Sequence, residues 1–277
     1  MAYSKATLAI DPPGTKVRED AIRASSHDGK WFLRVHVTDA ARGIAVRSNE
    51  DNRARNVVTD AVASIGNHGP QVYPASLLNA LALGPRDHTR VIAVSAAYTL
   101  DGDGAGVVLS AQELGGMYVV DYRQAELALH QHIAGAWHKI LIAASDLAHM
   151  LRRRWGVAEG GPETVADIVT DMMRAANAAA GSWAVENGVP LLFLNRSGAA
   201  CESSRLSVTP VGHDTVGGAP YARVTSPLRR YDDLINQRSI TAHLAGRPAP
   251  YSLQELNDLA AAMNRAHRPG VVRGPAT

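Results

Sequence analysis

Three observations predict a mixed α/β fold for this chain. Short apolar or alternating runs, typical of strands, occupy residues 7–11, 31–39 and 90–100. Helical periodicity then extends through residues 122–155 and 163–187. Of the 277 residues, 46% are hydrophobic and 19% are charged, which is ordinary globular composition and excludes a wholly disordered chain.

Turns rich in proline and glycine separate the first expected elements. The turn at 12–14, with the sequence PPG, stops the apolar run at 7–11. The turn DGDGAG at 101–106 joins the strand at 90–100 to the run VVLSAQEL, and this pattern indicates a hairpin. Residues 50–65 carry charges followed by an apolar run, and we expect them to be partly helical.

The C-terminal part of the sequence alternates one strand, one long loop and two helices. The run VPLLFLN at 189–195 predicts a buried strand, and residues 197–220 are rich in Gly, Ser and Pro and predict a loop. A helix is expected from 226 to 244, with a proline in its first turn. A last helix is expected over 252–267, opened by a capping box of Ser252 and Glu255.

Composition also limits the compartment and the partners. The only cysteine, Cys201, excludes an intramolecular disulfide and suits a reducing compartment. No apolar run reaches the roughly 18–20 residues that cross a bilayer, and the first residues lack the apolar core of a signal peptide. We therefore expect a cytoplasmic protein with no membrane partner. The net charge of +2 is so small that any nucleic acid would bind to a local patch.

Three carboxylates cluster around the first turn of the chain. Asp11, Glu19 and Asp20 lie within ten residues of one another. A hard cation such as Mg²⁺ binds where a few carboxylates converge with water and substrate phosphates, and a strand, turn and return could bring these three together. The other interpretation is a solvated acidic turn.

A second candidate segment is the arginine-rich sequence YARVTSPLRRYDD. Its arginines, Arg223, Arg229 and Arg230, surround an expected helix start, where free backbone N–H groups attract anions. Thr225 or Ser226 could cap that helix. The combination predicts a phosphate-binding clamp, and the alternative is an ordinary helix cap with surface arginines.

A third segment, MMRAAN on the helix at 163–187, places Asn177 among alanines. We expect this asparagine to hydrogen-bond a neighbouring loop.

Taken in order, these segments resemble the ribonuclease II/R family, whose catalytic unit is the RNB domain. The most specific likeness is TSPLRRYDDL, and the match covers nearly the whole chain. The similar segments are residues 7–21, 35–41, 73–104, 171–177, 189–196, 221–238 and 247–268.

This resemblance implies both an architecture and an activity. The implied fold is a single RNB-like domain over residues 1–268, followed by a flexible tail at 269–277. Its mixed sheet would be wrapped by helices around a funnel that admits an RNA 3′ end. The implied activity is Mg²⁺-dependent 3′ to 5′ hydrolysis of single-stranded RNA.

Matched residue by residue, the resemblance implies the following roles. The implied catalytic residues are Asp11, Glu19, Asp20 and Arg229, with Arg229 on the scissile phosphate and the three carboxylates around the metal. Tyr221, Thr225, Ser226 and Arg230 match the surrounding motif, and together with Asn177 and with Arg223 of the arginine cluster they are the expected RNA-binding residues.

The chain departs from the family pattern at the metal site. Val17 stands where the family has an aspartate, and Glu19 is longer by one methylene than the aspartate it replaces. Displacements of this size cost orders of magnitude in catalysis. The stacking tyrosine of the family aligns near Val62, and we expect a protein without flanking cold-shock or S1 modules. These departures predict a metal site that is weak or vacant, so the cofactor is none or weakly bound Mg²⁺.

Three functions stay open at this point. The first is an enzyme diverged from nuclease activity that acts on aminoacyl-tRNA, transferring the acyl group to a small-molecule acceptor or hydrolysing the ester at the tRNA 3′ end. In it Arg229 and Arg223 would hold terminal phosphates while the carboxylates orient the acceptor. The alternative is a Mg²⁺-dependent 3′–5′ exoribonuclease, and the third is a non-catalytic RNA-binding module. All three share an RNA 3′ end as partner.

Overall fold

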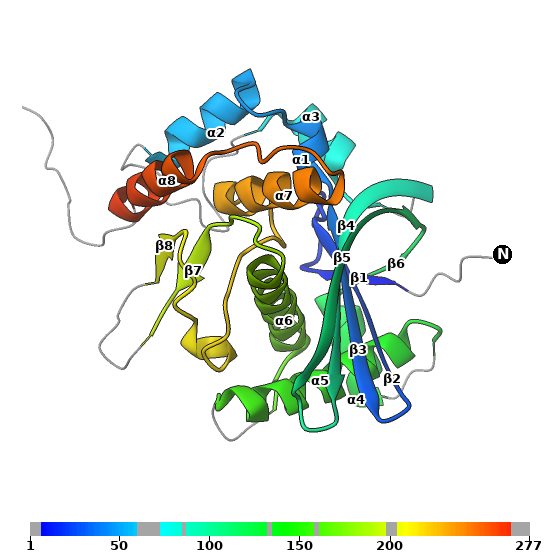
Figure 1. The fold of residues 1–277 in the computed structure, drawn as a ribbon. Coiled ribbons are helices and arrows are strands. Elements are labelled where there is room, and N and C mark those ends of the chain that lie inside the picture. Colours follow the sequence, from blue (N-terminus) through cyan, green and yellow to red (C-terminus); the bar gives the residue numbers. More distant parts are fainter. Residues whose placement is uncertain are drawn as a thin grey trace, which may run out of the picture.

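The computed structural model describes residues 7–59, 73–84, 87–131, 135–157, 161–197 and 204–266. The expected tail at 269–277 and the position near Val62 lie outside these residues. Within them the chain forms a mixed sheet with helices packed against it, which confirms the α/β class (Figure 1).

The main sheet has six strands in the order β5-β4-β3-β2-β1-β6. Its neighbouring strands run antiparallel except for β1 and β6, which pair in parallel and set Asp11 opposite Asp121. The strands are β1 (Leu8–Asp11), β2 (Asp20–His27), β3 (Lys30–Thr38), β4 (Asp87–Thr99), β5 (Gly104–Gly115) and β6 (Tyr118–Asp121). A separate pair consists of β7 (Phe193–Asn195) and β8 (Arg205–Ser207).

Two long helices cover one face of the main sheet. Helix α5 contacts β2, and helix α6 contacts β3, β4 and β5 (Figure 1). The helices are α1 (Ala40–Gly43), α2 (Asn49–Thr59), α3 (Ala75–Leu81), α4 (Tyr122–Gln131), α5 (His138–Trp155), α6 (Val165–Glu186), α7 (Tyr231–Leu244) and α8 (Leu253–Ala266).

Strand alternation divides β3 between the two faces of the sheet. Leu33, Val35 and Val37 are buried in the main core with α5 and α6. Arg34 lies between them in sequence and Phe32 lies directly before them, so both face the opposite way. On α6 the small side chains of Ala175, Ala176, Ala179 and Ala180 are buried and let the helix lie close to the strands.

A second core joins α1, α2 and α3 to the C-terminal helices α7 and α8. Arg238 of α7 is buried in it and donates to Asp51 Oδ1 at 2.7 Å and to the hydroxyl of Tyr251 at 2.6 Å. Tyr231 donates to the same aspartate oxygen at 2.8 Å. The buried charge of Arg238 is thus paired and hydrogen-bonded, as burial requires. Helix α8 begins with the predicted capping box, in which Ser252 N–H donates to Glu255 at 2.8 Å.

Three local predictions differ from the structure. Only Phe193–Asn195 of the expected strand at 189–195 is extended in a sheet, because the Asn236 amide bonds both the N–H and the C=O of Leu192 in place of a neighbouring strand. The helix expected from 226 begins at Tyr231, after an extended Arg230. The expected loop at 197–220 contains β8. The short edge strand β6 was not anticipated.

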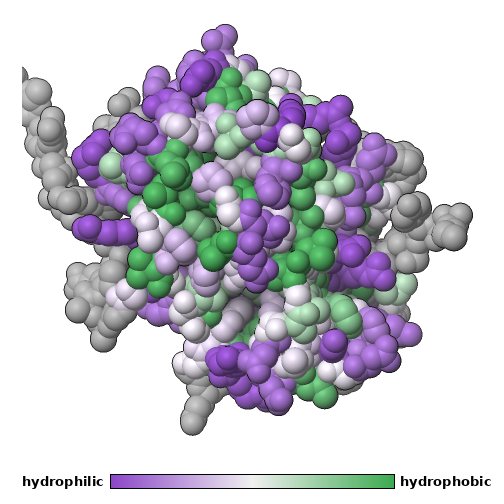
Figure 2. Space-filling view, viewed as in Figure 1, coloured by the Kyte–Doolittle hydropathy of each residue, from purple (hydrophilic) through white to green (hydrophobic). Residues whose placement is uncertain are grey.

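Hydrophilic and hydrophobic residues are intermixed on the side of the molecule seen in Figure 2. Among the helices of the described residues, none is long and apolar enough to span a bilayer.

Candidate active site

A cavity of about 720 Å³ lies where the β1–β2 connection, α6 and the segment before α7 meet. One wall carries carboxylates from the start of the chain, and the opposite wall carries polar and basic side chains from residues 221–230. The polar and charged lining residues are Asp11, Thr15, Glu19, Asp20, Tyr122, Thr170, Arg174, Asn177, Tyr221, Thr225, Ser226, Arg229 and Arg230.

The carboxylate wall is formed by two adjacent strands. Asp11 is the last residue of β1 and Asp20 is the first residue of β2, so the turn between them returns the chain to the same end of the sheet. Asp11 Oδ2 is buried and has no hydrogen bond among the described residues; Arg18 Nε lies 3.5 Å away as an ion pair. Val17 also lines the cavity and packs its side chain on the second core. The wall is therefore acidic but interrupted by an apolar residue.

The buried position of these carboxylates changes their acidity. Burial raises the pKa of Asp11 to about 6, against the opposing attraction of Arg18 and Arg229. Burial and the neighbouring carboxylates of Asp11 and Glu19 raise the pKa of Asp20 to about 7. The cavity thus holds two carboxylates whose negative charge the protein only partly compensates. Such groups are candidates for cation binding or proton transfer.

Helix α6 holds the opposite wall in place through Asn177. Its amide donates to the hydroxyl of Tyr221 at 3.1 Å and to Thr225 Oγ1 at 3.4 Å, and its carbonyl accepts from the N–H of Val224 at 2.9 Å. This confirms the expectation that Asn177 hydrogen-bonds a loop. One turn later, a Cβ on Gly181 would lie 2.6 Å from the carbonyl oxygen of Pro220. Glycine is therefore required there for the segment to lie against the helix.

Helix α7 fixes the same segment from the other side. Asp233 is fully buried and accepts from the N–H of Ser226 at 2.7 Å and from Arg230 at 2.7 and 2.8 Å. Asn236 donates to the carbonyl of Arg223 at 2.9 Å. The segment 221–230 has little regular structure, yet side chains of α6 and α7 form hydrogen bonds with its backbone groups. These hydrogen bonds hold the segment in one conformation, so its side chains have defined positions in the cavity.

Glu19 connects the two walls. Its Oε1 accepts from the N–H of Leu228 at 2.6 Å and its Oε2 accepts from Arg229 Nε at 2.8 Å. Arg229 also donates to Ser226 Oγ at 2.8 Å. Burial raises the pKa of Glu19, while Arg229 and the Leu228 N–H oppose that rise. In this structure the glutamate positions the arginine, and its oxygens are occupied by that role.

The structure brings nine of the ten candidate residues to this one cavity. Arg223 is the exception, because its Nε donates to Asp232 at 2.6 Å and the residue does not line the cavity. The expected capping role is wrong: neither Thr225 nor Ser226 caps α7, which begins after Arg230 with no side-chain cap. Thr225 instead accepts from Arg230 at 3.2 Å.

Four of the polar lining residues were not anticipated from the sequence: Thr15, Tyr122, Thr170 and Arg174. Tyr122 follows β6, so only the parallel pairing of β6 with β1 places it beside Asp11. Thr170 and Arg174 lie about one turn apart on α6, and Arg174 donates to Asp171 at 3.0 Å. Helical spacing from Asn177 was the signal that could have identified Arg174.

The carboxylates of the cavity fit a divalent cation only in part. In the described residues, no group of three or more His, Cys, Asp or Glu side chains is close enough to hold a metal. Mg²⁺, however, is commonly held by one or two carboxylates with water and substrate phosphates completing its shell. Asp11, with a buried oxygen that lacks a hydrogen bond, and Asp20 fit such a two-carboxylate site. Glu19 does not fit it without releasing Arg229.

Comparison with known sequences gives one family and several relatives. A family model for the RNB domain matches residues 199–246. An uncharacterized ribonuclease of Synechocystis sp. is 24% identical over 91% of this chain and 45% of that protein. The chloroplastic/mitochondrial ribonuclease II of Arabidopsis thaliana is 23% identical over 92% of this chain and 38% of that protein. The chain thus spans less than half the length of these two relatives.

Solved structures show the same fold. RNase R of Mycoplasma genitalium, in complex with ribose-methylated single-stranded RNA, superposes with a TM-score of 0.82 at 17% identity, over 96% of this chain and 55% of that one. Yeast Ssd1, described as a pseudonuclease, superposes with a TM-score of 0.76 at 16% identity, over 94% of this chain and 42% of that one. The fold thus occurs in a nuclease and in a pseudonuclease.

Proposed function

We propose that this chain, which resembles RNB-domain ribonucleases in sequence and in fold, binds the 3′ end of single-stranded RNA in the cavity and hydrolyses the terminal phosphodiester, as a 3′–5′ exoribonuclease. One observation carries the proposal: the partly compensated carboxylates of Asp11 and Asp20 share a cavity with Arg229. Phosphodiester hydrolysis needs groups of both signs around one phosphate.

Each wall has a separate task in this reaction. Arg229 faces the cavity from a position fixed by Glu19 and Ser226, and its guanidinium would bind the scissile phosphate. Asp11 and Asp20 would hold Mg²⁺, which when bound neutralises phosphate charge. Tyr221 and Thr225 shape the wall beside the bound nucleotide.

A second candidate function is binding of RNA 3′ ends without cleavage. It is favoured by the small number of oxygen atoms that are available to bind a metal. Both oxygens of Glu19 accept hydrogen bonds from Leu228 and Arg229, and Val17 supplies no metal ligand. The expected use of aminoacyl-tRNA is one form of this candidate, since ester chemistry needs no paired metal. The relatives named as ribonucleases support phosphodiester cleavage better than acyl transfer.

The test follows a 5′-labelled 20-nucleotide RNA in Mg²⁺ and in EDTA. The proposal expects a ladder that shortens from the 3′ end in Mg²⁺ only, and a loss of roughly a hundredfold or more in rate for Asp20→Asn. Asp28→Asn, at an exposed hairpin turn, is the matched control and should retain the rate.

Two results would contradict exoribonuclease activity. Full-length RNA after long incubation in Mg²⁺, with tight binding retained, assigns the protein to the non-cleaving candidate. A parallel incubation with mixed charged tRNAs and a small amine then separates its two forms, because loss of the ester without loss of RNA length supports aminoacyl-tRNA chemistry.

A further inference from the structure

The sheet face opposite α5 and α6 carries two arginines side by side. Arg23 of β2 and Arg34 of β3 are directly opposite in the antiparallel register, and both side chains are exposed. Like charges directly opposite in a sheet repel each other. In the part of the chain that the structure describes, neither guanidinium has a carboxylate within ion-pair distance; Arg34 donates only to Ser95 Oγ, at 2.9 Å. The pair is thus an uncompensated positive site.

The surrounding cross-strand positions contain no acidic side chain. The register aligns three further rows on this face, and their members are Ser25, Phe32, Ala97 and Gly106; His27, Lys30 and Thr99; and Ala21, His36, Ala93 and Ser110. Lys30 adds a third positive charge. The nearest acidic residue along the hairpin is Asp28, which lies in the turn beyond the strands.

The buried His36 lies close enough to the two arginines to be affected by their charge. It is two residues after Arg34 on β3, on the same face, and its Nδ1 has no hydrogen-bond partner among the described residues. Burial, with the charges of Arg34 and Arg23, lowers the pKa of His36 to about 4. The imidazole therefore stays neutral near pH 7, so the positive charge of this face comes from the arginines and Lys30.

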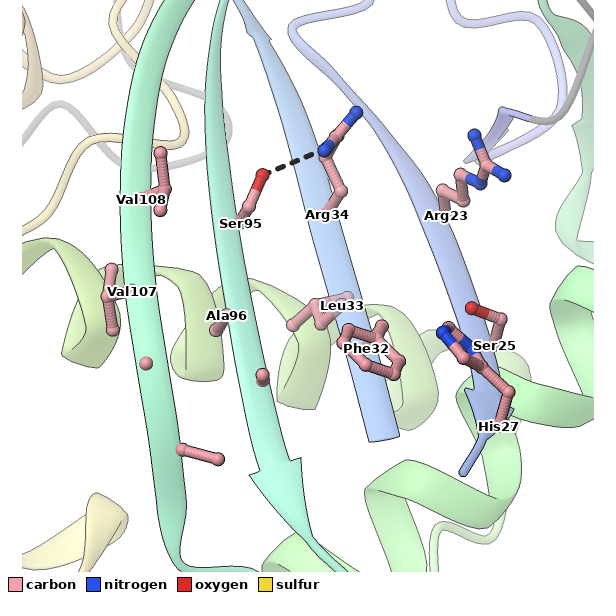
Figure 3. Close-up of a pocket in the computed structure, with 13 residues that line it drawn as sticks. Arg23, Ser25, His27, Phe32, Leu33, Arg34, Ser95, Ala96, Val107 and Val108 are labelled. Carbon is pink, nitrogen blue, oxygen red and sulfur yellow. Dashed lines mark hydrogen bonds between the residues drawn. The ribbon is translucent and has the colours of Figure 1, made fainter. Parts of the chain in front are cut away.

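Beside the arginines the face is hollowed and aromatic. A hollow of about 530 Å³ is lined by both arginines and by residues of all four strands β2 to β5 (Figure 3). Within it the rings of His27 and Phe32 stack nearly parallel, with centroids 4.1 Å apart. Val108, 62% exposed, adds an apolar wall. None of these lining residues belongs to the cavity of the candidate active site.

We propose that this hollow is a second RNA site, which holds single-stranded RNA through its phosphates and bases. The neighbouring arginine forks suit phosphate oxygens, and an anion between them would remove their mutual repulsion. The stacked rings and apolar wall suit an unpaired base, the combination found where proteins hold single strands. An acidic protein partner would use the arginines but not the ring stack.

The proposal deepens the proposed function, on which it rests for the direction of the strand. An RNA whose 3′ end lies in the cavity would contact the hollow with nucleotides further upstream. Short RNA would then occupy the cavity alone, whereas long RNA would occupy both sites. Length dependence therefore separates the two sites experimentally.

The test measures binding of fluorescent 20-nucleotide and 4-nucleotide RNAs by anisotropy, in EDTA to prevent cleavage. The double variant R23A/R34A should bind the long RNA roughly tenfold more weakly, with a far smaller change for the short RNA. For the long RNA, the slope of log K against log salt concentration should be smaller in magnitude by roughly 1.4 in this variant, about 0.7 for each lost phosphate contact. Phe32→Leu, which keeps the apolar volume but removes the ring, should weaken the long RNA several-fold.

The matched control is R53A/R265A, which removes two exposed arginines from α2 and α8. This control should leave the affinity for the long RNA and its salt dependence near the parent values. Unfolding curves of R23A/R34A that match the parent would exclude misfolding as the cause of weaker binding.

Two outcomes would overturn the proposal. The first is equal binding of the long RNA by R23A/R34A and the parent at the same salt. The second is an equal loss for both RNA lengths, which would place the effect at the cavity. If unchanged RNA binding accompanies a change in sedimentation, the face is a protein contact instead. Failure of the exoribonuclease proposal would give a different result: the RNA would stay uncut, while R23A/R34A would still bind the long RNA more weakly than the parent.

Discussion

The two groups of arginines in this molecule differ in how their charge is balanced. In the candidate active site Arg229 pairs with Glu19 and Arg230 pairs with Asp233, at 2.8 and 2.7 Å. On the open sheet face Arg23 and Arg34 stand together and none of the described carboxylates pairs with them. A guanidinium that is paired with a carboxylate is held in one orientation. A pair of arginines without a carboxylate lacks a counter-charge, which a bound ligand could supply. An arginine paired with a carboxylate therefore has a fixed orientation in the cavity, whereas the two arginines of the sheet face leave their charge available to an anionic ligand.

Breaking the balance in the cavity has the largest expected effect. Asp233→Asn leaves Arg230 without its buried counter-charge, so the free energy of unfolding should fall by about 3 kcal/mol. Urea titration monitored by circular dichroism measures this loss. Asp258→Asn, on the exposed side of α8, serves as the control, and equal stability of the two variants would contradict the role of Asp233.

The unbalanced carboxylates predict a pH dependence of stability. Asp11 and Asp20 titrate near pH 6 and 7 in the native state, against about 4 when unfolded. Between these values the native state binds protons that the unfolded state has lost, so the free energy of unfolding falls as pH rises from about 4 to about 7, by about 1–3 kcal/mol.

Urea titrations at a series of pH values measure this fall. In the double variant D11N/D20N the profile should be flatter over the same interval. Added Mg²⁺ should restore stability above pH 7 in the parent protein only. A parent profile that rises between pH 4 and 7 and is unchanged in the variant would contradict the raised pKa values.

A smaller effect is expected at Glu19, because its partner Arg229 is half exposed. Glu19→Gln keeps one oxygen to accept from the Leu228 N–H but replaces the other with an NH2 group that cannot accept from Arg229, so stability should fall by about 1 kcal/mol. The Nε–H proton of Arg229 should exchange faster with solvent, as measured by NMR. An unchanged exchange rate would mean that Glu19 does not position the arginine.

The smallest effect is expected on the open face. Because Arg23 and Arg34 repel each other and make few contacts, R23A/R34A should change the free energy of unfolding by less than about 0.5 kcal/mol. Thermal and urea unfolding of the variant and its parent measure this difference. A loss of several kcal/mol would show that the arginines are structural, and would end the contrast with the cavity.

Local patterns predicted most of the fold and failed where distant contacts decide. The strands at 7–11, 31–39 and 90–100 and the helix at 163–187 match the structure closely, because their side-chain periods are complete within each segment. The helical run expected at 122–155 is divided into α4 and α5, and the strand β2 was not anticipated. The start of α7 did not match, because Asp233 and Glu19 draw the N–H groups of Ser226 and Leu228 into a non-helical segment. Contacts between distant residues leave no periodic pattern in the sequence, so they could not be predicted from it.

Sequence reasoning named residues that the structure places together, but it did not predict their contacts. Asp11, Asp20 and Arg229 were named from two local clusters and from the resemblance, and all three line one cavity. The pairing of Glu19 with Arg229 was not foreseen, because a contact between residues 210 positions apart leaves no mark in either local segment. Tyr122 was missed for the same reason.

That separation also has a consequence in time. The bond from the Leu228 N–H to Glu19 joins residues 209 positions apart. At the usual rates of protein synthesis, the acidic turn leaves the ribosome roughly 10 to 40 seconds before the arginines that face it. During that interval the nascent chain carries Glu19 without Arg229 and the Leu228 N–H, its later partners. Only when residues 221–230 emerge can the cavity form, so a nascent chain that ends before them lacks one of its two walls.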